Sequence, residues 1–276
     1  MRWRQFFTPV ESMSTDQAHT FIADNPPEKL TILDVRQPQE YKRGHIPGAV
    51  LIPLPELNER IKEIDPQKPT VVYCAVGGRS RVAAQMLSGN GFEQIYNMSG
   101  GYKAWEGEAA VGDQNQGLAV FTDLASVSES LLIAYSMEKG LRDFYLSMLD
   151  KTKTDRVRKL FQKLADIEIN HQKRIFAEYQ RIENAKITLE AFETKIVPGI
   201  MEGGLTTEEY LAIYNTDLES SVDVISMAMS IEAQALDLYH RAAQITEDDQ
   251  TTESLLKIAA EERVHLNELA KLMESL

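Results

Sequence analysis

Cysteine is nearly absent from this chain: Cys74 is the only one among 276 residues. A single thiol excludes an internal disulfide, and it excludes a metal site built from paired Cys-x-x-Cys thiolates. Most lone cysteines are small inert core residues, so the neighbours of Cys74 decide whether it is reactive.

Long apolar runs are absent too, because no stretch of about 18 consecutive apolar residues occurs. The chain starts with Met1-Arg2-Trp3-Arg4 and continues in polar residues, unlike a signal peptide. We therefore expect a cytoplasmic protein without a membrane partner. The composition, 43% hydrophobic and 26% charged, is typical of globular proteins, and the length allows one large or two ordinary domains.

An excess of positive charge is also lacking. Residues 1–110 hold 12 Lys and Arg against 13 Asp and Glu, and residues 111–276 hold 17 against 29. Nearly all of the net charge of −13 thus lies in the second half. This disfavours nucleic acid or an anionic membrane as a partner. Part of the acidic excess is four candidate ligand carboxylates, and the rest indicates a solvated helical surface.

The second half contains an internal repeat. With a constant shift of 94 residues and no gap, the segments that start near 134 and 228 align. Each copy has a Glu followed 30 residues later by Glu-x-x-His. The six repeated residues are Glu138, Glu168, His171, Glu232, Glu262 and His265. One such motif alone is usually surface sequence, but two in register indicate a metal site.

Helix geometry explains how these residues would meet. Residues three apart share one face of a helix, and 30 residues allow an antiparallel partner to return to the same level. We expect helices over about 119–150, 154–184, 219–245 and 249–274. Four carboxylates buried together would repel one another, so a metal pair is favoured.

The connection over residues 185–218 is long, and a capping box at 206–209 predicts a short extra helix within it. Such a connection returns the chain across the bundle. A connection of this length also allows two chains to exchange hairpins. We therefore expect a homodimer, of which a domain-swapped dimer is one form.

Residues 119–276 resemble the rubrerythrin and ferritin-like family. The resemblance implies an all-α four-helix bundle whose six repeated residues bind two iron ions that react with oxygen or peroxide. Manganese or a mixed pair suits the same donors. Rubrerythrins usually carry a cysteine-ligated electron-donor module, which a chain with one cysteine cannot form. The electrons are therefore expected to come from an external donor, or from sulfur chemistry at Cys74.

The first 110 residues alternate between strand and helix patterns. Strands are predicted at about 30–35, 48–52, 70–73 and 95–97, and helices at about 14–25 and 80–87. This order indicates an α/β domain with a mainly parallel sheet, over residues 1–110. Residues 111–118 are assigned to a linker, and residues 119–276 to the helical domain.

Cys74 lies where such a fold places reactive groups, directly after the strand at 70–73. Two glycines follow, and a helix is expected to begin near Ser80. The backbone amides of the loop can therefore surround the sulfur as an anion-binding nest, which lowers a thiol pKa. The residues of this nest are Ala75, Val76, Gly77, Gly78 and Ser80, with Arg79 adding positive charge.

The same region resembles a rhodanese-type sulfurtransferase domain, over about residues 5–110. The resemblance rests on residues 33–36 with 40–41 and 44–49, the loop at 74–80, and residues 100–105. It implies that Cys74 takes a sulfane sulfur from a donor such as thiosulfate, holds it as a persulfide and passes it to a thiol or persulfide acceptor. Arg79 lies five positions after Cys74, one fewer than in the related phosphatase loop, which supports sulfur over phosphate.

Other residues of these motifs have structural interpretations. Asp34 and Arg36 are expected to form an ion pair that braces the loop, with substrate contact as the alternative. His45 lies at a turn and Trp105 is expected to pack in the core. Arg81 either adds positive potential for anionic donors or lies in solvent.

Two functional hypotheses follow. In the first, the chain is a sulfurtransferase that carries sulfane sulfur on Cys74, coupled to a di-iron bundle with oxidoreductase activity toward oxygen or peroxide. In the second, the sulfurtransferase is joined to a bundle that only binds or senses metal, or only dimerises, without turnover.

Overall fold

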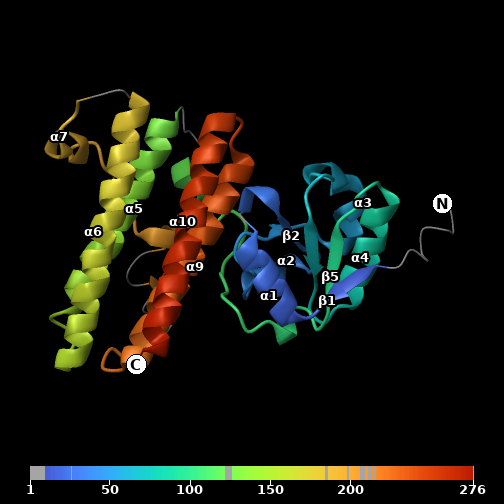
Figure 1. Cartoon of the computed structure of the whole chain (residues 1–276), viewed down its shortest axis with the longest axis horizontal. Helices are drawn as coiled ribbons and strands as arrows, with labels where there is room; N and C mark the ends of the chain where they lie inside the picture. Colours follow the sequence, from blue (N-terminus) through green and yellow to red (C-terminus); the bar gives the residue numbers. More distant parts are fainter. Residues whose placement is uncertain are drawn as a thin grey trace. The chain divides into compact units, whose positions relative to one another are not determined.

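We describe the protein from a computed structural model, which describes residues 10–275 apart from 26, 122–125, 184–185, 198, 206–208, 211–212 and 214–215. The chain divides into two compact units, Met1–Gln114 and Asn115–Leu276 (Figure 1). The division falls inside residues 111–118, the predicted linker.

A five-stranded parallel sheet with the order β1-β5-β4-β2-β3 forms the first unit. The strands are β1 (Glu11–Met13), β2 (Thr31–Asp34), β3 (Val50–Leu51), β4 (Thr70–Tyr73) and β5 (Ile95–Met98). All four residues of β4 are buried, as expected for a parallel strand covered on both faces. The predicted α/β fold is thus confirmed, whereas β1, an edge strand of three residues, was not predicted.

The helices of this unit are α1 (Thr15–Asp24), α2 (Pro38–Lys42), α3 (Leu57–Arg60) and α4 (Gly78–Gly89), with 3-10 turns at Pro27–Lys29, Leu54–Glu56, Ile61–Glu63 and Tyr102–Ala104. The predicted capping box opens α1: Gln17 N–H donates to Ser14 Oγ at 3.2 Å, and Ser14 N–H donates to Gln17 Oε1 at 2.9 Å. Helix α4 follows β4 through the Cys74 loop, so the loop is held between two regular elements.

Four long helices form the second unit: α5 (Val127–Met148), α6 (Asp155–Glu183), α9 (Ser221–Ile245) and α10 (Asp249–Glu274). Helix α5 packs along α6, and α9 packs along α10 (Figure 1). The predicted all-α fold is confirmed, but the first helix begins later than expected. Residues Leu118–Phe121 form a 3-10 turn, and Ser126 caps α5 by accepting a hydrogen bond from Glu129 N–H.

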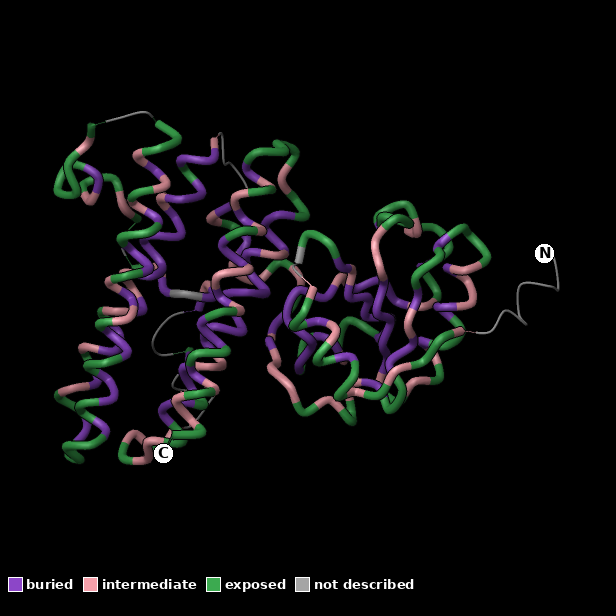
Figure 2. Tube along the Cα trace, in the orientation of Figure 1, coloured by how far each residue is buried: buried purple, intermediate pink, exposed green. Residues whose placement is uncertain are grey.

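Buried residues follow the inner face of each long helix (Figure 2). They form two apolar clusters, and on α5 and α9 the change from one cluster to the other occurs at Glu138 and Glu232. On α6 the same change occurs across Glu168 and His171. The predicted ligands therefore form a polar layer between two apolar layers. In the described part of the chain, no helix is long and apolar enough to cross a membrane.

The connection between α6 and α9 contains α7 (Leu189–Glu193) and a 3-10 turn at Glu202–Gly204. Phe192 anchors it, because its ring is fully buried and its centroid lies 4.9 Å from that of Tyr135 and 4.7 Å from that of Tyr179. The short helix predicted from the capping box at 206–209 falls on residues 206–208, which lie outside the described residues.

Gly140 lets this connection cross α5 closely. A Cβ at this position would collide with the carbonyl oxygen of Ile200. Replacing Gly by Ala in an open helix stabilises by about 1 kcal/mol, but here the connection would have to move. We expect Gly140→Ala to lower the free energy of unfolding by about 1–3 kcal/mol in urea titrations. Asp143→Ala, at an exposed site on the same helix, is the control, and a stabilised Gly140→Ala protein would contradict the packing.

Candidate functional sites

The loop after β4 places the Cys74 sulfur just beneath the surface. The Cys74 residue is 1% exposed, while Val76, two positions later, is 62% exposed. Gly77 has a φ of 98°, which a residue with a side chain rarely adopts, and this turn directs the Gly77 N–H to Cys74 Sγ at 3.1 Å. The sequence Val-Gly-Gly thus folds the backbone around the sulfur.

The surroundings of the sulfur favour its anion. Burial by itself raises the pKa of the Cys74 thiol, but the Ser80 hydroxyl and the N–H groups of Ser80, Val76 and Gly77 stabilise the thiolate, so the pKa lies below its ordinary value. Three of the five residues expected to supply amides therefore do so. Gly78 instead begins α4, and Ala75 helps to hold the loop because its carbonyl accepts a hydrogen bond from Lys103 N–H.

The segment after β5 holds the Cys74 loop in place through backbone hydrogen bonds. Tyr102 N–H donates to Cys74 O at 2.7 Å, and Lys103 N–H donates to Ala75 O at 3.0 Å. Gly101 has a φ of 60°, and a Cβ there would collide with Cys74 O and the next peptide unit. Glycine is therefore needed at position 101, where the two backbone segments approach closely.

Asp34 and Arg36 form a fully buried ion pair with Nη2 and Oδ2 2.6 Å apart. The Arg36 guanidinium also donates to Gly44 O at 2.8 Å and lies 4.2 Å from the centre of the Tyr102 ring. Because Tyr102 holds the Cys74 carbonyl, the ion pair supports the loop through this ring. His45 is also buried, with its ring stacked 3.5 Å from that of Tyr41.

Arg79 lies at the rim of the loop and is paired with Glu40, a residue of the rhodanese-type motif for which the sequence predicted no role. Its two terminal nitrogens donate to the Glu40 carboxylate at 2.8 and 2.7 Å. These bonds lower the pKa of Glu40 to about 2. Arg79 is also close enough to Cys74 for the two to interact electrostatically, so Glu40 orients a positive charge beside the sulfur. Arg81 and the half-buried Trp105 lie away from these contacts: Arg81 is exposed, and Trp105 Nε1 donates to Glu108 O at 2.8 Å.

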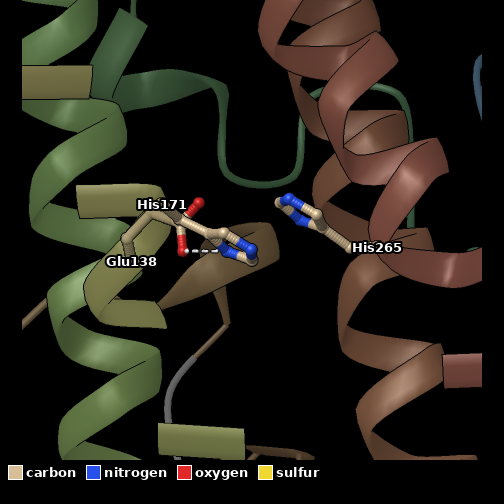
Figure 3. A group of neighbouring side chains, drawn as sticks. All are labelled: Glu138, His171 and His265. Atoms are coloured by element: carbon tan, nitrogen blue, oxygen red, sulfur yellow. Dashed lines mark hydrogen bonds and ion pairs between the residues drawn. The ribbon is translucent and has the colours of Figure 1, made fainter. Parts of the chain in front are cut away.

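The second candidate site is the polar layer of the bundle, where all six repeated residues meet. His171 Nδ1 lies 3.3 Å from Glu138 Oε2 and 2.8 Å from Glu168 Oε2. His265 Nδ1 lies 3.5 Å from Glu232 Oε2 and 2.9 Å from Glu262 Oε2. Figure 3 shows the two imidazoles facing each other from α6 and α10, and their centroids are 3.5 Å apart with an angle of 2° between the rings.

The donor atoms form two groups that share one histidine. Glu138, His171 and His265 form the first, and Glu232, Glu262 and His265 form the second, with the donor atoms of each group within 4.8 Å of one another. His265 therefore contributes a donor atom to both groups.

Burial makes this layer unfavourable for separate negative charges. Burial raises the pKa of Glu138 to about 8, and burial together with the nearby Glu232 charge raises that of Glu168 to about 8. Although burial lowers it, the pKa of His265 rises to about 12, because the Glu262 and Glu232 carboxylates stabilise the imidazolium. The layer thus needs positive charge at its centre.

The layer fits a metal pair. Glu262 Oε1 is buried and has no hydrogen-bond partner among the described residues. Carboxylate oxygens and imidazole nitrogens are suitable donors for iron or manganese. A cavity of about 110 Å³ reaches Glu168, Glu232 and His265, with Leu164, Leu269 and other residues lining its walls. Small molecules could therefore approach the layer.

Sequence reasoning missed Arg174, which is exposed on α6 but whose Nη2 lies 3.0 Å from His265 Nε2. Its position three residues after His171 was the only available signal. The repeat does not predict it, because the equivalent residue of the second copy is Glu268. Asn97 was missed as well. It lies behind Ser80, and only the sheet brings the two residues together.

Models of two known families match the two units of the chain separately. The Rhodanese-like domain model matches residues 14–108, and the Rubrerythrin model matches residues 129–273, just over half of the chain. Both resemblances predicted from the sequence are therefore confirmed: a sulfurtransferase-type domain is followed by a di-iron domain in one chain. The Rubrerythrin match also implies iron binding in the second unit.

Among curated proteins, the chain is 48% identical over 80 residues to "Uncharacterized protein YqhL" of Bacillus subtilis, covering 29% of this chain and 64% of that one. It is 40% identical over 81 residues to "Putative sulfur carrier protein YrkF" of the same organism, covering 29% and 44%. The chain thus spans less than two thirds of either relative.

Among solved structures, a rhodanese-like domain protein from Staphylococcus aureus is 28% identical, with coverage of 38% of this chain and all of that one and a TM-score of 0.35. On the family matches, the chain belongs to the rubrerythrin family and carries a rhodanese-like domain in its first unit.

Proposed function

We propose that the chain is a sulfurtransferase that carries sulfane sulfur as a Cys74 persulfide, coupled to a di-iron bundle with oxidoreductase activity toward oxygen or peroxide. The observation that carries the first part is the Cys74 sulfur itself. It lies in a loop of inward-facing amides that lowers its pKa.

The sulfur transfer has two balanced steps. The Cys74 thiolate attacks the outer sulfur of a donor such as thiosulfate, the donor's sulfur–sulfur bond breaks, and sulfite leaves with the electron pair. A nucleophilic acceptor, such as a thiolate or cyanide, then attacks the outer sulfur of the persulfide, and Cys74 leaves as thiolate. The loop amides stabilise the anion in both steps, and Arg79, oriented by Glu40, attracts the anionic donor.

In the bundle, Glu138, Glu168, His171, Glu232, Glu262 and His265 are proposed to hold two iron ions, with manganese or a mixed pair as the alternative occupants. Bound iron would supply redox chemistry toward oxygen or peroxide. The single cysteine leaves no thiolate-ligated electron donor within the chain, so the reductant is external. The 110 Å³ cavity supports the proposal because it admits a molecule of peroxide size to the carboxylates.

To test the proposed oxidoreductase activity of the bundle, peroxide consumption is measured with iron-loaded protein and a supplied reductant. We expect many turnovers per chain, because the cavity reaches the layer directly. Consumption that ends after one equivalent would instead support a bundle that senses or stores metal, or one that only dimerises. Thiocyanate formation from thiosulfate and cyanide, measured on the same preparation, tests the sulfur half separately.

A further inference from the structure

A chain of buried polar groups lies behind the Cys74 sulfur. Ser80, in the first turn of α4, has its Oγ 3.5 Å from Cys74 Sγ and 2.6 Å from Asn97 Oδ1. Asn97 lies on β5 and is 4% exposed, and its Nδ2 donates to Ser12 Oγ on β1 at 3.4 Å. Three elements of the sheet domain, α4, β5 and β1, thus contribute to this chain of polar groups, which includes the Ser80 hydroxyl.

This hydroxyl has a single proton and cannot donate to both neighbours at once. The 2.6 Å distance assigns the proton to Asn97 Oδ1, because 3.5 Å is long for a strong bond even to sulfur. The Ser80 oxygen can then accept from the Cys74 thiol. When the sulfur becomes an anion, it needs a donor, and the Ser80 proton can serve it only by leaving Asn97.

We propose that Asn97 is a positioning residue that competes with the Cys74 sulfur for the Ser80 proton. The proposal deepens the function proposed for Cys74 and rests on it only in taking Cys74 as the nucleophile. This competition suits Cys74, whose sulfur must act first as a nucleophile and then as a leaving group. While Asn97 holds the proton, the sulfur is less stabilised and attacks the donor more readily. Once the proton turns to the sulfur, Cys74 is a better leaving group for the acceptor step.

Two substitutions at Asn97 should move the Cys74 thiol in opposite directions. Asn97→Leu has a similar volume but no acceptor, so Ser80 donates to the sulfur without competition. We expect the pKa of Cys74 to fall by roughly half to one unit. Asn97→Asp places a charged acceptor behind Ser80, which holds the proton more strongly and repels the thiolate, so the pKa should rise by about one unit. The pKa is read from the rate of alkylation by iodoacetamide as a function of pH.

A second arm shows whether Asn97 acts through Ser80. In the Ser80→Ala background, Asn97→Leu should leave the alkylation pKa unchanged, because the shared proton is gone. Tyr96→Phe is the matched control: it changes the neighbouring residue of β5, whose side chain points to the opposite face, and should have no effect in either background. The charged groups around the loop, Arg79 with Glu40 and Arg36 with Asp34, are the same in every variant.

Three results would overturn the proposal: shifts of the same sign in Asn97→Leu and Asn97→Asp, no shift in either, or a full Asn97→Leu shift that persists without Ser80. Circular dichroism melts check folding. Should Asn97→Leu not fold, the rise in the pKa of Cys74 caused by Asn97→Asp should become smaller in the Ser80→Ala background, which separates the shared proton from direct charge repulsion. Alkylation needs no sulfur donor. A wild-type protein that alkylates as expected but transfers no sulfur would therefore contradict the proposed function and leave the role of Asn97 standing.

Discussion

Cys74→Ser is expected to lower thiocyanate formation from thiosulfate and cyanide by at least about 10³-fold. A serine hydroxyl is almost fully protonated at neutral pH, and it cannot form the persulfide that divides the transfer into two steps. The loop would remain in place, because its supports are backbone bonds to Tyr102 and Lys103. Mass spectrometry after incubation with thiosulfate gives a second measurement: the wild-type chain gains the mass of one sulfur atom, and the variant does not.

Two comparisons make this result specific. Val82→Ala, at an exposed position on α4, should transfer sulfur at close to the wild-type rate. The iron content of Cys74→Ser should equal that of the wild type, because its single change lies in the other compact unit. Equal rates in wild type and Cys74→Ser would rule out Cys74 as the sulfur carrier.

His265→Ala is expected to have the largest effect on the metal content of the bundle. His265 belongs to both groups of donor atoms, so its loss weakens both positions at once. Loss of a hydrogen-bonded neighbour of a ligand already lowers metal affinity about 10- to 100-fold, and loss of a shared ligand should exceed this. We expect iron to fall from about two per chain in the wild type to fewer than one in the variant, as measured by elemental analysis after desalting.

His240→Ala is the matched control, because it removes a half-buried histidine of α9 that is not among the six residues. It should retain the wild-type iron content. Helical circular dichroism of His265→Ala verifies that the bundle has formed. Two tightly held irons in this variant would mean that the metal lies elsewhere.

The sequence predicted the polar layer of the bundle well, because the layer depends on helix periodicity. The i, i+3 spacing of Glu168 and His171 and the 30-residue return from Glu138 determine which side chains share a level. The start of α5 was harder to predict. Residues 118–121 are apolar and have a helical pattern, yet they turn as a 3-10 segment, and the cap at Ser126 begins the helix.

Contacts between distant segments could not be predicted in this way. Glu40 reaches Arg79 across 39 positions, and Asn97 reaches Ser80 across 17, only because the parallel sheet places their elements side by side. The three residues of β1 form a strand because β5 supplies a partner, and their own sequence, Glu-Ser-Met, has little strand preference. The motif around Cys74 predicted the position of the sulfur and the Asp34–Arg36 ion pair. The roles of Glu40 and Asn97 became visible only in the folded structure.

The stacked imidazoles of His171 and His265 come from different hairpins of the repeat. Each hairpin supplies half of the six donors, so neither hairpin alone contains the complete layer, and metal bound there would link the two halves of the bundle. The halves are nevertheless not interchangeable, because Arg174 and Glu268 carry opposite charges at equivalent places.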